Sequence, residues 1–491
     1  MTGILFYNSL SRQKELFIPI NNGGKVGIYV CGPTVYGPPH IGHARSAVVF
    51  DILHRYLIFK GYKVLLVRNY TDVGHLEYDA DEGDDKIEKQ AIRENNSPYE
   101  IAQKYINIYR HEIGLLGCLP PTIEPQATAF IHEQINITEQ LIRQELAYIV
   151  NGSVYFDVCR YNEQYGDYGV LSGRKIENLY STTRDLKAQE EKKNSYDFAL
   201  WKKADKKHIM RWSSPWSDGF PGWHTECIAM SIKFLGEEFD IHGGGEDLKF
   251  PHHEAEIAQA RALYGNRLAR IWMHHNLVNI NEQKMSKSLN NYITLHDLFW
   301  NKDNILGTNY HPMVLRFLFI QTHYRSPLSL SAASLEAARK GLTRIINAFF
   351  SLDNLSSPST TTSNLTLQEK IFSSINACFK ALEDDLNTAE ALAHLSEMVT
   401  IINDLETKKI DIESISIDTM DYLKTNFTNI SCTILGLQRE VIDDKLQLIT
   451  SLYTQARERK DFTQVDFIRH ELEKQQMMMC DFNGFARMKK K

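Results

Sequence analysis

One stretch near the amino terminus constrains the fold more than any other part of the chain. Residues 25–31 (KVGIYVC) form an apolar run of strand length, residues 32–40 (GPTVYGPPH) are rich in Gly and Pro, and residues 41–61 have a helical pattern. A second strand-like run, YKVLLVRNY, follows at 62–70. A strand, a crossover helix and another strand form a βαβ unit, which predicts a parallel sheet with helices on its faces.

A second strand-and-helix segment lies far downstream. Residues 238–245 (EFDIHGGG) have the pattern of a strand and residues 250–265 that of a helix, so a long insertion separates the two parts of the sheet. From Ser331 onward, apolar and charged residues recur at helical spacing. We therefore predict an α/β fold with a Rossmann-like parallel sheet domain split by an insertion, followed by an all-α helical bundle and a small C-terminal domain.

The bulk composition excludes several classes of protein. A chain of 491 residues exceeds what one hydrophobic core usually organises, so several domains are expected. It has no apolar run of about eighteen residues and no basic-then-apolar start, so we expect a cytoplasmic protein without membrane span or secretory signal. The seven cysteines show no disulfide pattern. With a net charge of −6, any nucleic acid must be held by local basic patches.

Two motifs have the chemistry of phosphate binding. In PPHIGHAR, His40 and His43 lie where a helix begins, and its free amides and dipole favour an anion there. In KMSKS (284–288), Lys284 and Lys287 stand beside small polar residues, as a loop that closes on phosphates requires. Each motif taken alone also has an ordinary explanation, because histidine can cap a helix and a Lys/Ser loop can be solvated surface.

Four side chains of metal-ligand type accompany these motifs. Cys31 ends the first predicted strand and Cys227 lies in PGWHTEC, while His252 and Glu256 in FPHHEAE are four apart and share one helix face. Thiolate, imidazole and carboxylate are all competent zinc ligands. However, buried cysteine is ordinarily a small hydrophobic residue, and no CxxC spacing marks a metal site here. The spacing alone leaves both explanations open.

Longer sequence segments around these residues resemble those of one enzyme family. PPHIGHAR and KMSKS together resemble the paired signatures of class I aminoacyl-tRNA synthetases, and YVCGPTVYGPPHIGH, GWHTECIAMS, DIHGGGEDL and FPHHEAEIAQ are similar to the cysteine-specific members, the cysteinyl-tRNA synthetases. The resemblance implies a ligase that activates L-cysteine with ATP and Mg²⁺ as cysteinyl-adenylate and transfers it to the 3′ end of tRNA(Cys). It also implies one zinc ion per chain, bound by Cys31, Cys227, His252 and Glu256.

The same resemblance implies a role for each matching side chain. Donors to phosphate charge in the transition state would be His40, His43, Lys284 and Lys287. ATP would be bound by Gly42 with His40, His43 and Lys287. Cysteine would be bound by Cys31, Thr71, Trp223 and Asp247, with Asp247 facing the substrate ammonium. Asp247 could instead cap a helix and Trp223 could be core, and His253 stays unassigned beside the ligands.

Zinc has a physical reason in this family. Cysteine and serine differ by one atom, and packing alone separates such substrates by only about 1 to 3 kcal/mol. A bound zinc ion ionises a coordinated thiol, whereas a hydroxyl is harder and far less acidic and gains little. The resemblance therefore implies that the metal selects cysteine directly.

The resemblance extends to the helical half. Residues 381–392 (ALEDDLNTAEAL) and 456–475 are similar to family segments that bind the anticodon arm, although amphipathic helices could simply pack together. Two departures from the family are an acidic insert at 74–83 and the ending NGFARMKKK. The implied domains are the catalytic halves 1–120 and 213–295, an inserted subdomain 121–212, a stem-contact region 296–335, a tRNA-binding bundle 336–440 and an anticodon domain 441–491.

Three other functions share parts of this pattern. A cysteine ligase of the mycothiol pathway shares the catalytic half but lacks a full anticodon domain, whereas about 160 residues follow Ser331 here. An RNA-binding paralogue would not need both motifs, and a simple nucleotidylyltransferase would need neither the candidate ligands nor the helical half. We expect a monomer whose partners are tRNA(Cys), L-cysteine and ATP, with no membrane.

Overall fold

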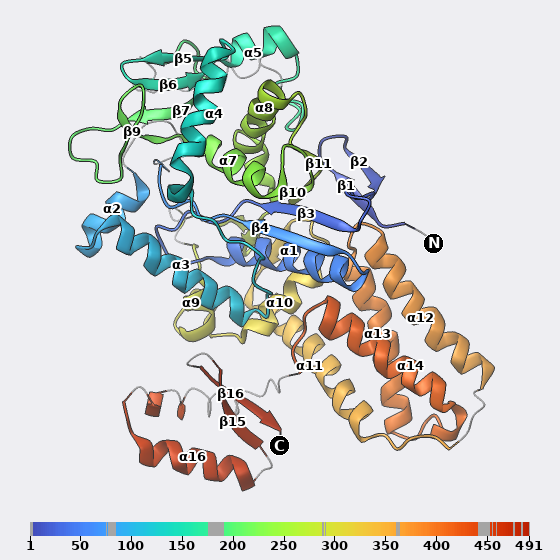
Figure 1. Ribbon diagram of the computed structural model, residues 1–491. Helices are drawn as coiled ribbons and strands as arrows, with labels where there is room; N and C mark the ends of the chain where they lie inside the picture. Colours follow the sequence, from blue (N-terminus) through green and yellow to red (C-terminus); the bar gives the residue numbers. More distant parts are fainter. Residues whose placement is uncertain are drawn as a thin grey trace. The chain divides into compact units, whose positions relative to one another are not determined.

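The computed structural model describes residues 3–74, 76, 85–174, 191–286, 289, 291–359, 364–439, 452–453, 455–457, 459–474, 477–482 and 485–490. The chain divides into two compact units, whose elements are drawn in Figure 1. Unit 1 comprises residues 1–296 with the short stretches 324–328 and 383–386, and unit 2 comprises 297–323, 329–382 and 387–491.

The centre of unit 1 is a four-stranded parallel sheet in the order β11-β10-β3-β4. Its strands are β3 (Lys25–Val30), β4 (Lys63–Arg68), β10 (Phe239–Gly245) and β11 (Ala269–His275). Helix α1 (Ile41–Phe59) connects β3 to β4, and α8 (His252–Tyr264) connects β10 to β11. Both predicted strand-and-helix units are thus confirmed, and they join through β3 and β10.

Helices cover the two faces of this sheet. Helix α1 lies on one face, and α7 (Trp223–Leu235) lies on the other with α8 packed against it (Figure 1). Strand β10 is buried along its whole length because both of its faces are covered. The carboxyl ends of parallel strands meet at one edge, which is where ligands bind in sheets of this kind. Cys31 directly follows β3 at that edge.

The segment between the two halves of the sheet contains a second sheet. It is antiparallel, with strands in the order β5-β6-β7-β9-β8. These strands are β5 (Ala147–Val150), β6 (Ser153–Phe156), β7 (Phe198–Lys203), β8 (Trp212–Ser213) and β9 (Asp218–Pro221). The helices of this region are α2 (Lys86–Glu94), α3 (Pro98–Leu115), α4 (Ile131–Arg143) and α5 (Val158–Tyr165).

A buried aspartate from the motif ALEDDLNT belongs to unit 1. Unit 1 begins with an antiparallel hairpin of β1 (Leu5–Asn8) and β2 (Gln13–Leu16). The carboxylate of Asp385 accepts hydrogen bonds from the backbone N–H of Tyr7 at 2.8 Å and from the hydroxyl of Tyr324 at 2.5 Å. Its other oxygen accepts a bond from Nε of Arg325 at 2.7 Å. This acidic residue therefore stabilises the sheet unit.

Unit 2 is mainly helical, as the spacing of apolar residues predicts. Its long helices are α10 (Pro312–Ile320), α11 (Ala332–Asn354), α12 (Leu365–Glu383), α13 (Thr388–Glu406) and α14 (Ile417–Thr428). Four shorter elements lie between residues 278 and 330 of the sequence. They are β12 (Val278–Ile280), β13 (Gln283–Lys284), α9 (Leu295–Trp300) and β14 (Leu328–Leu330). Helix α11 begins at a capping box in which Ser331 and Ser334 each accept a hydrogen bond from the other's backbone N–H.

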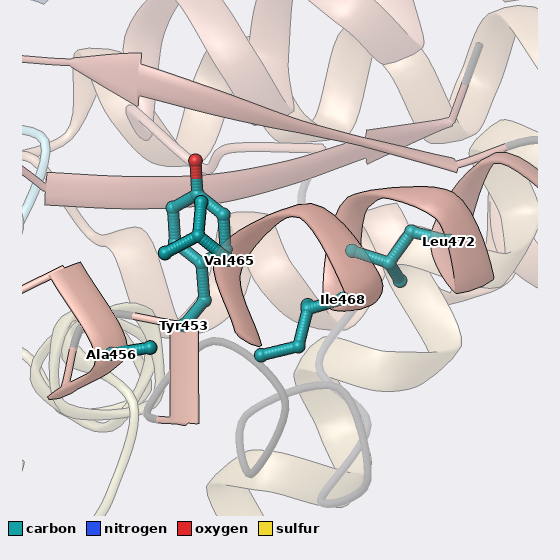
Figure 2. Close-up of a cluster of buried hydrophobic side chains, with 5 residues drawn as sticks. All are labelled: Tyr453, Ala456, Val465, Ile468 and Leu472. Carbon is teal, nitrogen blue, oxygen red and sulfur yellow. The ribbon is translucent and has the colours of Figure 1, made fainter. Parts of the chain in front are cut away.

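The last part of the chain forms a small satellite core. Helix α16 (Phe462–Lys474) packs beside an antiparallel hairpin of β15 (Met477–Phe482) and β16 (Phe485–Lys490). Figure 2 shows Val465, Ile468 and Leu472 on one side of the helix, gathered with Tyr453 and Ala456. Their spacing of three and four residues places these apolar side chains on one helical face.

Candidate active site

The two histidines of PPHIGHAR both cap the start of α1. Nδ1 of His40 accepts a hydrogen bond from the backbone N–H of Gly42 at 3.0 Å, and Nδ1 of His43 accepts one from the N–H of His40 at 3.3 Å. The two rings stack with centroids 3.7 Å apart. Burial lowers the pKa of His43 to about 4, so its imidazole is neutral at pH 7. Because Nδ1 accepts in each ring, Nε2 carries the hydrogen and remains a donor.

The segment around KMSKS lies against the start of α1. The backbone N–H of Leu295 donates to the carbonyl of Pro39 at 2.9 Å, and the ring of Tyr292 lies 5.3 Å from that of His40. The end of the Met285 side chain approaches Gly42, where an added Cβ would meet it at 3.9 Å. The structure thus brings the two predicted phosphate-binding motifs together.

Of the two lysines of KMSKS, only Lys284 is among the described residues. Lys284 is exposed at the end of β13, and its carbonyl accepts a hydrogen bond from Nδ2 of Asn291 at 3.0 Å. The Oδ1 atom of Asn291 accepts the N–H of Ser286 at 2.8 Å, which closes a turn across the loop. Lys287 lies outside the described residues.

A buried arginine, which the sequence did not single out, ties α1 to the base of this loop. Arg45 is only 1% exposed. Its guanidinium donates to the carbonyl of Leu277 at 2.7 Å and to the carbonyl of Ser326 at 2.5 Å. Leu277 directly precedes β12, the first strand of the hairpin that leads into KMSKS. Arg45 therefore fixes the position of that hairpin relative to the helix that bears both histidines.

The four predicted metal ligands converge at the carboxyl edge of the sheet. Cys31 follows β3, Cys227 lies in α7, and His252 and Glu256 lie one turn apart in α8. One ligand atom from each lies within 4.8 Å of all the others. The sulfur atoms are 3.7 Å apart, and Sγ of Cys227 is 3.4 Å from Nε2 of His252. Oε1 of Glu256 is 3.8 Å from Sγ of Cys31 and 3.1 Å from Nε2 of His252.

These separations fit one tetrahedral metal ion. Zinc at about 2.3 Å from sulfur and about 2.0 to 2.1 Å from nitrogen or oxygen requires ligand atoms roughly 3.8 Å (S to S), 3.6 Å (S to N or O) and 3.4 Å (N to O) apart. Each measured edge lies within roughly 0.3 Å of its ideal value. The donor set of two thiols, an imidazole and a carboxylate is one that zinc takes.

A second group of side chains at the same place fits a metal less well. Cys31, His242, His253 and Glu256 also bring one candidate atom each within 4.8 Å. However, Nε2 of His242 lies 2.8 Å from Oε2 of Glu256, which is the length of a hydrogen bond and is too short for two ligands of one zinc ion. His242 therefore acts as a partner of the carboxylate. Its place in DIHGGG was the only sequence signal for it.

Two residues of PGWHTEC orient the candidate ligand His252. Nδ1 of His224 lies 3.1 Å from Nδ1 of His252, and the indole of Trp223 stacks on the His252 ring with centroids 4.3 Å apart. Metal-bound imidazoles ordinarily have such a partner on their second nitrogen. Trp223 thus lies beside the candidate metal site. From the sequence alone, a place in the hydrophobic core was also possible for this residue. His224 was not predicted.

Burial makes the two thiols poor ligands unless a cation is present. The pKa of Cys31 is raised well above its usual value, first by burial and then by Cys227 and Glu256. Burial also raises the pKa of Cys227, and the Glu256 carboxylate raises it further. A metal ion reverses this effect because it stabilises the thiolate directly. The chemistry of the cluster therefore favours a bound cation.

The predicted cysteine-binding residues fall into two environments. Thr71 is buried, and its hydroxyl donates to Oε2 of Glu226 at 2.9 Å. Burial raises the pKa of Glu226 well above its usual range, and the neighbouring carboxyls of Asp72 and Asp85 raise it further. Asp247, in contrast, is exposed in the turn after β10. Glu226 was missed because a glutamate within a helix has no distinctive sequence signal.

Acid is expected to weaken unit 1 through its buried histidines. His275 is 6% exposed, and burial lowers its pKa to about 4 from 6.5. Between pH 6.5 and 4 the unfolded chain binds this proton and the folded chain does not, so stability falls with falling pH by about 1.4 kcal/mol per pH unit. Urea unfolding of His275→Gln at pH 6.5, 5.5 and 4.5 should show a shallower pH dependence than the wild type. Equal slopes would contradict the assignment.

Comparisons with known proteins show the family of the chain. Residues 17–340 match the family model of the tRNA synthetases class I (C) catalytic domain, and residues 379–438 match the DALR domain. A cysteine–tRNA ligase of Bacteroides fragilis is 47% identical over 96% of this chain and 95% of its own length. A cysteine–tRNA ligase of Thermus thermophilus is 43% identical over 96% of each chain.

Solved structures support the same fold at lower identity. A methionyl-tRNA synthetase of Mycobacterium tuberculosis bound by methionyl-adenylate matches with a TM-score of 0.59 and 11% identity, covering 90% of this chain and 96% of that one. No helix among the described residues is long and apolar enough to cross a membrane. From the family models and the close relatives together, the chain belongs to the class I aminoacyl-tRNA synthetases, in the family of the cysteine–tRNA ligases.

Proposed function

We propose that this enzyme selects L-cysteine through a zinc ion held by Cys31, Cys227, His252 and Glu256, activates it with ATP and Mg²⁺, and transfers it to tRNA(Cys). The observation that carries the proposal is the convergence of four ligand atoms at tetrahedral spacing. When bound, zinc would ionise the thiol of the substrate, which serine cannot match. One ion per chain is expected.

The residues at the start of α1 would bind and orient the nucleotide. His40 and His43 offer Nε2–H donors beside a helix amino terminus, where phosphate oxygens are stabilised. An added Cβ at Gly42 would lie 2.9 Å from the His40 ring, so glycine leaves room there for that imidazole and would leave room for the phosphate chain. Lys284 and Lys287 would approach the same phosphates from the loop, so that donors surround the charge that develops during adenylate formation.

The remaining roles follow from the resemblance. Thr71, Trp223 and Asp247 would contact the cysteine substrate, and the helical half would bind tRNA, with the domain boundaries at 120, 212, 295, 335 and 440. Trp223 is supported by its stacking against His252. A monomer in the cytoplasm remains our expectation.

One assay tests the metal proposal directly. Purified enzyme should acylate total tRNA with cysteine and should discriminate strongly against serine. After the zinc is removed with a chelator, acylation with cysteine should fall to near background and should return when zinc is added. A metal-free sample that kept cysteine charging and its selectivity over serine would overturn the proposal.

A further inference from the structure

A one-way chain of hydrogen bonds runs beside the candidate metal ligands. The backbone N–H of Gly32 donates to Oδ1 of Asn69 at 2.8 Å, which fixes the orientation of the amide. Nδ2 of Asn69 then faces Oγ1 of Thr71 at 3.3 Å, and that hydroxyl donates to Oε2 of Glu226 at 2.9 Å. Asn69, Thr71 and Glu226 are each at most 2% exposed.

The backbone N–H of Gly32 sets the direction of this hydrogen-bond chain. An added Cβ on Gly32 would lie 1.6 Å from the carbonyl oxygen of Asn69, so only glycine allows the two backbones to approach this closely. A backbone N–H can only donate, so Asn69 must present its oxygen to Gly32 and its NH₂ group to Thr71. Thr71 therefore receives a hydrogen bond from one side and must give its own on the other.

This arrangement leaves the Thr71 hydroxyl as an acceptor only. A hydroxyl has one hydrogen to donate and two lone pairs to accept. The hydrogen is used on Glu226 and one lone pair on Asn69, so a single lone pair is left for a ligand. Oε1 of Glu226 has no hydrogen-bond partner within the described part of the chain although it is buried. The local chemistry thus suits a cationic donor.

The hydrogen-bond chain includes the sequence neighbours of two candidate metal ligands. Gly32 follows Cys31, Glu226 precedes Cys227, and Oδ1 of Asn69 lies 4.0 Å from Sγ of Cys227. The ammonium of cysteine is separated from its thiol by only two carbon atoms. A thiol bound at the cluster would therefore keep its ammonium within reach of this hydrogen-bond chain.

We propose that Glu226 is a positioning residue for substrate recognition: it holds the Thr71 hydroxyl so that only a lone pair faces the ammonium of L-cysteine. This inference rests on the proposed function, in which cysteine binds through its thiol. It assigns a role to a residue that acts through Thr71 and does not itself ligate the metal. It also separates recognition of the ammonium from recognition of the sulfur.

The test compares two ligands that differ only in the ammonium. Binding of L-cysteine and of 3-mercaptopropionate, which lacks the amino group, is measured by calorimetry on zinc-loaded wild type and Glu226→Leu, which removes the acceptor of the Thr71 hydroxyl. We expect Glu226→Leu to weaken L-cysteine about 10- to 100-fold, the range for leaving a buried hydroxyl without its acceptor, and to leave 3-mercaptopropionate within about twofold. In steady-state activation, KM for cysteine should rise far more than kcat falls.

Two controls make the result specific. Asp72→Asn changes a nearby buried carboxylate that accepts hydrogen bonds from Thr128 and is not part of the hydrogen-bond chain. The affinity for cysteine should therefore change by less than about threefold. In a Thr71→Val background, Glu226→Leu should cause little further loss for cysteine.

The outcomes separate this inference from the proposed function. An equal loss of both ligands in Glu226→Leu, with zinc content unchanged, would mean that the residue serves only the fold and would overturn the inference. Retention of full cysteine affinity would overturn it as well. Failure of the wild type itself to bind 3-mercaptopropionate in a zinc-dependent way would count against the proposed function instead.

Discussion

Replacement of Cys227 by serine is expected to remove both zinc and cysteine activation. The thiol lies 3.7 Å from Sγ of Cys31 and 3.4 Å from Nε2 of His252, at one corner of the candidate metal site. A serine hydroxyl at this corner is harder and far less acidic, so it would leave three ligands in a buried site. Changes to outer partners of a metal cost about 10- to 100-fold in affinity. Loss of a ligand should therefore exceed 100-fold.

Metal analysis and cysteine-dependent ATP–pyrophosphate exchange check this expectation together. The matched control is Cys378→Ser, which alters an equally buried thiol in α12 that donates to the carbonyl of Ala391. Serine can make the same hydrogen bond, so that variant should keep about one zinc per chain and near-normal exchange. If Cys227→Ser retained stoichiometric zinc, the candidate ligand set would be wrong.

Replacement of His43 by alanine is expected to slow adenylate formation about 10²- to 10³-fold, which corresponds to roughly 3 to 4 kcal/mol of barrier. The imidazole is neutral because burial lowers its pKa to about 4. Its Nδ1 accepts the backbone N–H of His40, so Nε2–H is the free donor. Loss of that donor should lower kcat for cysteine-dependent exchange with little change in tRNA affinity. Single-turnover formation of the adenylate measures the step directly.

An asparagine variant separates the chemical role from the capping role. The Oδ1 atom of asparagine can accept the backbone N–H of His40 as Nδ1 of His43 does, so His43→Asn should keep the cap of α1. The Oδ1 atom of asparagine lies where Nδ1 lies, but its side chain ends short of the Nε2 position and offers no donor there, so exchange should still be slow. Because the pKa of His43 is near 4, the wild-type rate should show no titration of this group between pH 6 and 8. An asparagine variant with normal exchange would show that only the cap matters.

Local sequence patterns were sufficient for the sheet, and the resemblance named four residues that the structure brings together. Strand β3 (KVGIYV) is a mostly apolar run that is visible without any tertiary information, and β10 (FDIHGGG) is buried throughout although it contains polar residues. The four candidate ligands carry the reactive chemistry itself, so their residue types mark them. His253, left unassigned, lies 3.3 Å from the sulfur of Cys31 and belongs to the second candidate group, with His242.

The residues that were missed act through contacts between distant parts of the chain. Arg45 matters because of the carbonyls of Leu277 and Ser326, and Glu226 because of the hydroxyl of Thr71. None of these partners is close in sequence, and a lone charged residue inside an apolar helix has no pattern of its own. Only the folded arrangement reveals that a backbone amide at Gly32 dictates which way a hydroxyl points.

The position of Asp385 limits how this enzyme can be shortened. Its carboxylate is the shared acceptor for Tyr7, Tyr324 and Arg325, yet it comes from a loop between two helices of the other unit. A recombinant fragment that stopped before that loop would leave the buried tyrosine hydroxyl without its acceptor, a defect of about 1 to 3 kcal/mol. A minimal version of the ligase would therefore have to extend past residue 386, where unit 1 ends, or replace the carboxylate of Asp385 by another acceptor.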